Sequence, residues 1–289
     1  MSDFVLSCCS TADLAKEHFE ARGIEYICFH YYMDDVEYAD DLGQSMPFDE
    51  FYKRMAEGAD TRTAQVNISE YLDYFTTFLE QGKDLLHVTL SSGISGSYQS
   101  ACSAAMIARE RYPERKVYVV DSLAASSGFG LLMDKLADKR DEGMDIESLA
   151  AWLEENRLHL CHWFTVNDLM YLKRGGRVSA ATAAVGTMLN IKPVLHVDDE
   201  GHLISVSKVR GRKASIEALA AKVGQLGEGF DNRVAFISHG DCLEDAQTLA
   251  AMLKERYGVQ EVIIGYVGAV IGSHAGPDVL ALFFLGKHR

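Results

Sequence analysis

The chain has 289 residues, of which 48% are hydrophobic, and this length is sufficient for two hydrophobic cores of ordinary size. Lys and Arg total 28 against 42 Asp and Glu, so the formal net charge is −14 and most of the surface would repel nucleic acid. The first residues include Asp3, Asp13 and Lys16 and lack a basic segment followed by an apolar one, so we expect no signal peptide and a cytoplasmic protein.

The first half of the chain alternates strand-like and helix-like segments. Apolar runs at 4–9, 24–33, 85–90 and 116–122 predict strands, and helices are expected near 11–22, 48–57, 69–81 and 98–111 and after Gly128. This alternation is typical of a doubly wound, largely parallel α/β sheet. Ligands of such sheets bind beyond the carboxyl ends of the strands, so we expect the site near the loops after Leu90 and Val120.

A second α/β unit is predicted from about residue 158. Residues 159–166 alternate like a strand, a helix ends at the pair Gly175 and Gly176, and 194–209 predict a hairpin that turns at Asp199, Glu200 and Gly201. Helices near 213–226 and 242–257 alternate with strands near 234–240 and 261–269. We therefore expect domains at 1–157 and 158–289, with the ligand in the cleft between them.

Membrane insertion and metal binding are not indicated. The most apolar window, 262–285, contains four glycines, His274, Pro277 and Asp278, which favour core strands over a membrane span. Six cysteines include no CxxC pair, which is typical of a reducing compartment. His159, Cys161 and His162 would not face one side of a strand, so we expect no metal site.

The segment SSGISGS at 91–97 is the first candidate for binding an anion. Its glycines let a ligand approach Ser91, Ser92, Ser95 and Ser97, and the following helix offers free amide groups. Simple helix capping explains the same residues. The spacing does not match the GxSxG nucleophile motif of hydrolases.

Three further residues are candidates. Arg177 follows the glycine pair in LKRGGRVS, and its planar guanidinium suits a carboxylate or phosphate, although a solvated arginine at a helix end is the alternative. His274, in a predicted glycine-rich loop, could donate to an oxyanion or be structural. Thr63, by itself, is typical of a turn or a helix N-cap.

Two clusters of basic residues stand out in this acidic chain, and together they would fit one anion-binding site. No GxxxxGK[ST] motif for nucleotide phosphates is present. The clustered basic residues are Lys173, Arg174, Arg177, Lys208, Arg210, Arg212 and Lys213.

In chain order, these motifs resemble those of the DegV family. They comprise STADL after the first strand, a T-x-Q segment, SSGISGSYQSA, VDS, DLMYLKRGGRVS with LNIKPVL, KVRGRK and HAGP. The resemblance implies two α/β domains that enclose one long-chain fatty acid such as palmitate. It also implies a bacterial carrier similar to the binding subunit of fatty acid kinase, which presents the carboxylate to a separate ATP-using subunit. Such a carrier is not itself an enzyme and needs no cofactor.

The resemblance also implies roles for single residues. Thr63 and Ser95 match the hydroxyl donors to the carboxylate, Arg177 and His274 match residues near the head group, and Ser92 is a further donor. The sequence departs from the family pattern at three places, which leave the preferred acyl chain open. Cys9 replaces the aspartate of D-S-T, the segment Thr63–Asn67 replaces T-S-Q-P-S, and Asp278 replaces a glycine.

Two other functions stay open at this point. A serine hydrolase or acyltransferase would use Ser95 or Ser92 as nucleophile, His274 as base and Asp121 as the acidic partner. A sensor of an undefined small molecule is the third possibility.

Overall fold

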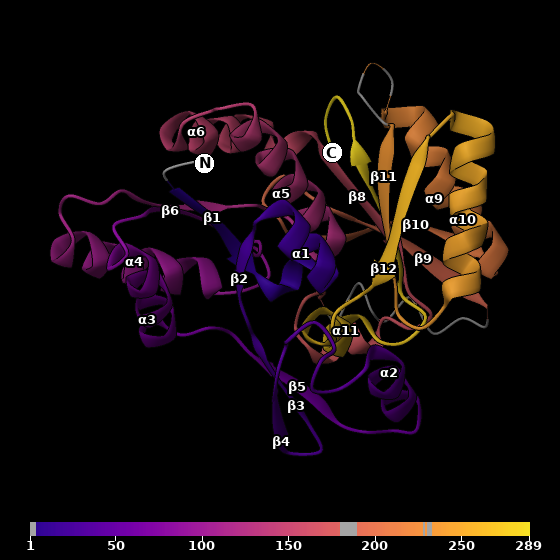
Figure 1. Cartoon of the computed structure of the whole chain (residues 1–289). Helices are drawn as coiled ribbons and strands as arrows, with labels where there is room; N and C mark the ends of the chain where they lie inside the picture. The colour runs from indigo at the N-terminus through magenta and orange to yellow at the C-terminus, as the bar shows by residue number, and fades with distance from the viewer. Residues whose placement is uncertain (1–3, 180–189, 228, 230–232) are drawn as a thin grey trace.

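The computed structural model describes residues 4–179, 190–227, 229 and 233–289. Residues 180–189, which run from the end of the predicted Arg177 motif to the first residue of LNIKPVL, lie outside the described residues. Figure 1 shows two α/β units side by side, with a smaller antiparallel sheet below them. The predicted two-unit α/β class is therefore confirmed.

The first sheet is entirely parallel, as the alternation of strands and helices predicts. Its order is β2-β1-β6-β7, and β1 pairs with both β2 and β6. Helices α3 and α4 pack together beside β6, and α6 packs on β6 and β7. The strands are β1 (Phe4–Cys9), β2 (Glu25–Ile27), β6 (Asp84–Thr89) and β7 (Val117–Asp121).

The second sheet is mixed, with order β10-β9-β8-β13-β11-β12. Only the β11–β12 pair of this sheet is parallel, and β9 and β10 form the predicted antiparallel hairpin. Helices α9 and α10 pack on this sheet, at the right of Figure 1. The strands are β8 (Leu160–Thr165), β9 (Ile191–Val197), β10 (Leu203–Arg210), β11 (Val234–His239), β12 (Glu261–Tyr266) and β13 (Leu280–Leu285).

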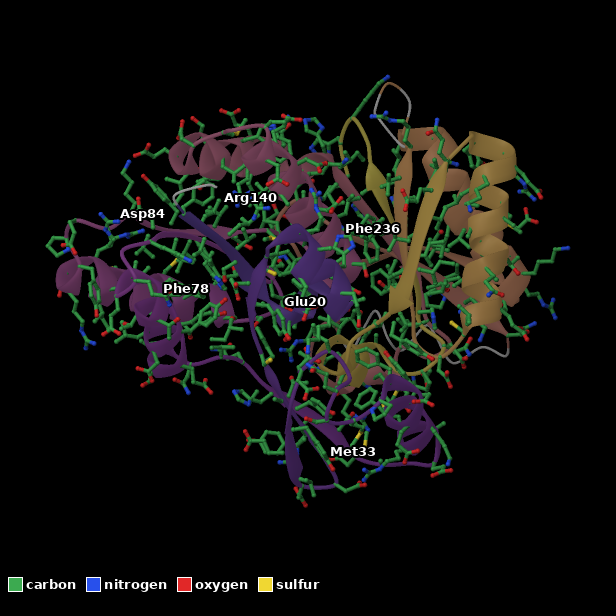
Figure 2. All side chains as sticks on the ribbon, in the orientation of Figure 1. Glu20, Met33, Phe78, Asp84, Arg140 and Phe236 are labelled. Carbon is green, nitrogen blue, oxygen red and sulfur yellow. The ribbon has the colours of Figure 1, made fainter. Side chains whose placement is uncertain are left out.

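The third sheet was not predicted. One of its strands comes from an apolar run that the sequence predicts as a single strand. Residues 24–33 form β2 and then β3 (His30–Met33), which lies between β4 (Val36–Ala39) and β5 (Thr61–Ala64) in an antiparallel sheet. Met33 is labelled in this small sheet in Figure 2, whereas Phe236 lies on β11. The chain leaves the first sheet after Ile27, so β2 and β3 belong to different sheets.

The predicted helices lie close to their expected positions, except the first, and α6 and α11 lie where no helix was predicted. The expected helix at 11–22 is a 3-10 turn at Ser10–Ala12 followed by α1, because Asp13 adopts a left-handed conformation with φ of 49°. The helices are α1 (Lys16–Arg22), α2 (Phe48–Ala56), α3 (Ile68–Leu79), α4 (Ser97–Arg111), α5 (Ser126–Asp141), α6 (Ile146–Asn156), α7 (Met170–Arg174), α9 (Arg212–Leu226), α10 (Leu243–Tyr257) and α11 (Ala269–Ala275). A second 3-10 turn spans Arg157–His159. No described helix is long and apolar enough to cross a membrane.

Helix α5 connects the two large sheets. It follows β7 of the first sheet, yet it contacts β8, β11 and β13 of the second. A side chain at Gly128 would place its Cβ 2.5 Å from the ring of Phe283, so glycine allows this close approach. A hydrophobic core therefore continues from the first sheet through α5 to β8 and β13, and a second core lies under α9 and α10.

Candidate ligand-binding site

A cavity of about 430 Å³ lies between the two halves of the molecule. Its walls come from β5, the loops after β6 and β7, strands β8 and β13, the β9–β10 hairpin and helix α11. The predicted location beyond Leu90 and Val120 is thus where the cavity forms. Apolar side chains dominate the lining, namely Phe29, Leu90, Ile94, Phe164, Leu172, Val197, Leu203, Val267, Val270, Ile271, Val279 and Phe283.

The polar lining includes a direct contact between Thr63 and His274. Thr63 lies on β5, which pairs with β3, and Thr63 Oγ1 is 2.8 Å from His274 Nε2. Thr63 is therefore a strand residue, not the turn or cap residue that its sequence context indicates. Asn67 caps α3 instead, in a capping box with Glu70.

His274 occupies the last turn of α11, so its predicted position in a loop is wrong. The loop prediction failed because three glycines in 268–276 indicate irregular structure, while packing against β5 and α7 keeps this segment helical. The Cβ of a side chain at Gly175 would lie 2.1 Å from His274 Nδ1. Gly175 therefore gives the imidazole its space.

His274 is uncharged at neutral pH. Burial, which has the largest effect, and the charges of Arg177 and Arg174 together lower its pKa to about 4. A neutral imidazole has one N–H donor and one acceptor nitrogen. When Nε2–H donates to Thr63 Oγ1, the Thr63 hydroxyl is free to donate to a ligand.

Arg177 joins two of the predicted motifs. Its Nε donates to the Ile94 carbonyl at 3.1 Å, and a terminal nitrogen donates to the Gly175 carbonyl. Arg177 lines the cavity, and burial lowers its pKa, but a guanidinium remains charged at neutral pH. The later basic cluster, Lys208, Arg210, Arg212 and Lys213, does not line the cavity, so the structure does not bring both clusters to one site.

The two predicted serines differ in position. Ser95 lines the cavity, and its Oγ accepts a hydrogen bond from the Ser97 amide at 3.2 Å, so it supports the start of α4 while facing the ligand space. Ser92 is exposed and does not line the cavity. Its amide donates to Asp121 Oδ1 at 3.2 Å.

The described residues do not form the Ser-His-Asp arrangement of a hydrolase. His274 Nε2 contacts Thr63, and Asp121 accepts the amides of Ser92 and Leu123. Among the residues that the structure describes, Ser95 forms no hydrogen bond with His274, and His274 forms none with Asp121. Asp121, the acidic residue of the possible triad, thus stabilises the loop after β7 instead.

Three polar residues of the lining were not predicted from the sequence, namely Gln65, Ser126 and His162. Ser126 opens α5 with φ of 54°, and its hydroxyl donates to buried Asp13. Ser126 could have been found, because it lies in the predicted loop after β7. The sequence gives no signal for His162, whose pKa is lowered well below its ordinary value by burial within β8.

One acidic group in the described residues could hold a metal, although no such site was expected. Asp198, Glu200 and His202 have ligand atoms close together at the β9–β10 turn. However, Asp198 Oδ1 accepts the amides of both Glu200 and His202, so this carboxylate stabilises the turn.

Fold and site together define a two-unit α/β protein that encloses an apolar cavity with hydroxyl, imidazole and guanidinium groups on its wall. A family model for an uncharacterised protein of the DegV family matches residues 9–287. The chain belongs to the DegV family. A DegV domain-containing protein of Clostridium perfringens is 40% identical over 289 residues, which cover 100% of this chain and 99% of the relative.

Solved structures of proteins similar to this chain have the same fold. A DegV family protein from Thermus thermophilus, described by its fatty acid binding, is 28% identical, with a TM-score of 0.87 and coverage of 98% of this chain and 99% of that one. DegV of Bacillus subtilis, a fatty acid binding protein, is 27% identical, with a TM-score of 0.84 and coverage of 99% and 100%. A stearic acid-binding protein from Eubacterium ventriosum is 25% identical, with a TM-score of 0.88 and coverage of 98% of each chain.

Proposed function

We propose that this protein binds one long-chain fatty acid without a covalent bond and presents its carboxylate to a partner kinase in the cytoplasm. The observation that carries the proposal is a mostly apolar cavity whose polar groups include Thr63, Ser95, Arg177 and His274. Its volume falls in the usual range for small-molecule sites. The fatty acids bound by DegV proteins of Thermus thermophilus and Bacillus subtilis support the same ligand class.

The apolar wall is proposed to supply most of the affinity. Burying about 14 methylenes at about 0.8 kcal/mol each gives an upper limit near 11 kcal/mol, which the loss of ligand freedom reduces. The hydroxyl groups of Thr63 and Ser95 then determine which end of the ligand lies at the polar groups. Arg177 adds a favourable charge for a carboxylate.

The same arrangement fits a carrier better than a catalyst. Hydroxyl donors stabilise a carboxylate while leaving oxygen lone pairs available to attack a phosphoryl group. The sequence has no P-loop, so we propose that ATP binds to a separate fatty acid kinase subunit. The isolated protein is then expected to hydrolyse no ATP and to form acyl phosphate only with that subunit.

Mass spectrometry of lipid extracted from the gently purified protein tests the ligand. We expect a C14–C20 fatty acid, and a rise in melting temperature when palmitate or oleate is added to delipidated protein. Absence of both results would overturn fatty acid binding. ATP turnover by the protein freed of contaminating kinases would overturn the carrier role, and labelling of Ser95 by a fluorophosphonate would support the hydrolase instead.

A further inference from the structure

A series of contacts between buried polar side chains ends at Ser95. The role that we infer from these contacts rests on the proposed function. Ser97 donates its amide to Ser95 Oγ, and Ser97 Oγ lies 2.5 Å from the Tyr71 hydroxyl. The Tyr71 hydroxyl lies 3.3 Å from Cys9 Sγ. We call Cys9, Tyr71 and Ser97 the relay, and each of them is 0% exposed.

The relay joins three elements of the first α/β unit. Cys9 ends β1, Tyr71 lies on α3, and Ser97 is the first residue of α4. Tyr71 on α3 thus holds the Ser97 side chain at the point where the chain leaves the cavity, and Cys9 on β1 contacts Tyr71 in turn. The amide of the same residue bonds to the cavity-lining Ser95.

The groups of the relay remain uncharged. Burial raises the pKa of the Cys9 thiol to about 11 and raises the pKa of the Tyr71 phenol well above its ordinary value. Burial also lowers the pKa of His87, whose Nε2 lies 3.8 Å from Cys9 Sγ, to about 3. No group of the relay therefore changes its protonation state around neutral pH.

The hydrogen of Ser95 decides what this residue offers a ligand. A serine hydroxyl donates one hydrogen and accepts through its lone pairs. Ser95 Oγ accepts the Ser97 amide, and no residue that the structure describes accepts the hydrogen of the Ser95 hydroxyl. We propose that Tyr71 is a positioning residue, which acts through Ser97 to direct the Ser95 hydroxyl toward an anionic head group and so favours carboxylates over uncharged head groups.

Tyr71→Phe isolates the hydroxyl from the ring. The ring packs against Phe75 and His87 with centroids 5.6 and 5.3 Å away, and phenylalanine preserves these contacts. Tyr74→Phe is the matched control, because Tyr74 lies on the same helix and its ring is 6.2 Å from that of His87. The Tyr74 hydroxyl contacts Ser7 Oγ at 2.8 Å instead of Ser97.

The test compares dissociation constants for palmitate and hexadecanol, which share a chain and differ in the head group. Tyr71→Phe is expected to weaken palmitate binding about 2–10-fold, the effect of one neutral hydrogen bond, and hexadecanol binding less than about 2-fold. The preference for the acid therefore falls. Ser97→Ala is expected to act in the same direction, and Tyr74→Phe to retain the wild-type preference.

The possible outcomes separate this role from the proposed function. Wild-type protein that binds neither ligand overturns fatty acid binding and the positioning role with it. Wild-type protein that prefers palmitate, with the same preference in Tyr71→Phe and Ser97→Ala, overturns only the positioning role. Equal weakening of both ligands, or an equal change in Tyr74→Phe, identifies a structural effect and overturns it as well. If Tyr71→Phe does not fold, Ser97→Ala decides.

Discussion

The polar groups and the apolar wall of the cavity share several segments of the chain but depend on different interactions. Thr63, Ser95, Arg177 and His274 each lie in a separate segment, and hydrogen bonds fix their positions. The apolar wall comes from strands, from helices α7 and α11 and from the loops after β2, β6 and β12, and its shape depends on side-chain packing. Under the proposed function, we expect the wall to determine how tightly a ligand binds, and the polar groups to determine which ligand binds and in which direction.

Blocking the apolar wall should have the largest effect. Ala281 lines the cavity on β13, and Ala281→Phe would fill part of the ligand space. We expect more than about 100-fold weaker binding of fatty acid and fatty alcohol alike, measured by calorimetry. Leu282→Phe, which points into the other core, is the control for overpacking and should retain binding if it folds. Selective loss of the acid would contradict the division between wall and polar groups.

The depressed pKa of His274 should make the unliganded protein sensitive to acid. The unfolded imidazole binds its proton near pH 6.5 and the folded one near pH 4, so the free energy of unfolding falls as pH decreases through this range. The loss should reach about 2–3 kcal/mol, from 1.36 kcal/mol for each pKa unit after allowance for partial exposure. Urea unfolding of wild type and His274→Gln between pH 4 and 7.5 measures it. If the free energy of unfolding fell equally with pH in both proteins, His274 would not be the cause of the acid sensitivity.

Removing one head-group donor should have a smaller and more selective effect. Ser95→Ala leaves the apolar wall intact and removes one hydrogen bond to a charged group, worth about 1.5–3 kcal/mol. Fatty acid affinity should fall about 10–150-fold, and phosphate transfer by the proposed partner kinase should fall further, because a misplaced carboxylate is a poor nucleophile. A fluorescent fatty acid titration and a kinase-coupled assay measure these quantities. Unchanged values in both would mean that Ser95 serves only the start of α4.

Shortening the ligand by one methylene should have the smallest effect. Each methylene buried in the wall contributes about 0.8 kcal/mol, which corresponds to about 4-fold in affinity. A series of saturated acids should therefore weaken by this step in wild type and in Ser95→Ala equally. Steps that depend on Ser95 would show that the head group and the tail do not bind independently.

The sequence predicts the first sheet well because parallel α/β units have a strong local signal. Strands β1, β6 and β7 alternate with helices in the expected way. The small third sheet escapes prediction because β4 and β5 have four residues each and carry exposed residues, so no apolar alternation marks them. Their pairing with β3 depends on contacts distant in sequence.

Prediction of the site also followed local signals. Ser95 and Arg177 belong to glycine-rich motifs that can be recognised from the local sequence, and both line the cavity. Ser92 belongs to the same kind of motif but lies outside the cavity, because its amide is bound by Asp121 on the neighbouring strand. The contact between Thr63 and His274 spans 211 positions, so only the fold brings these residues together.

Helix α5 has a consequence for how the molecule unfolds. The helix belongs to the first half by sequence and packs on the second sheet, where Ser126 and Ser127 contact Ser238 of β11. Separating residues 1–157 from the remainder would expose the apolar surfaces on both sides of this contact. The two halves are therefore expected to melt in one cooperative calorimetric transition, and neither half to persist as an autonomous folding unit.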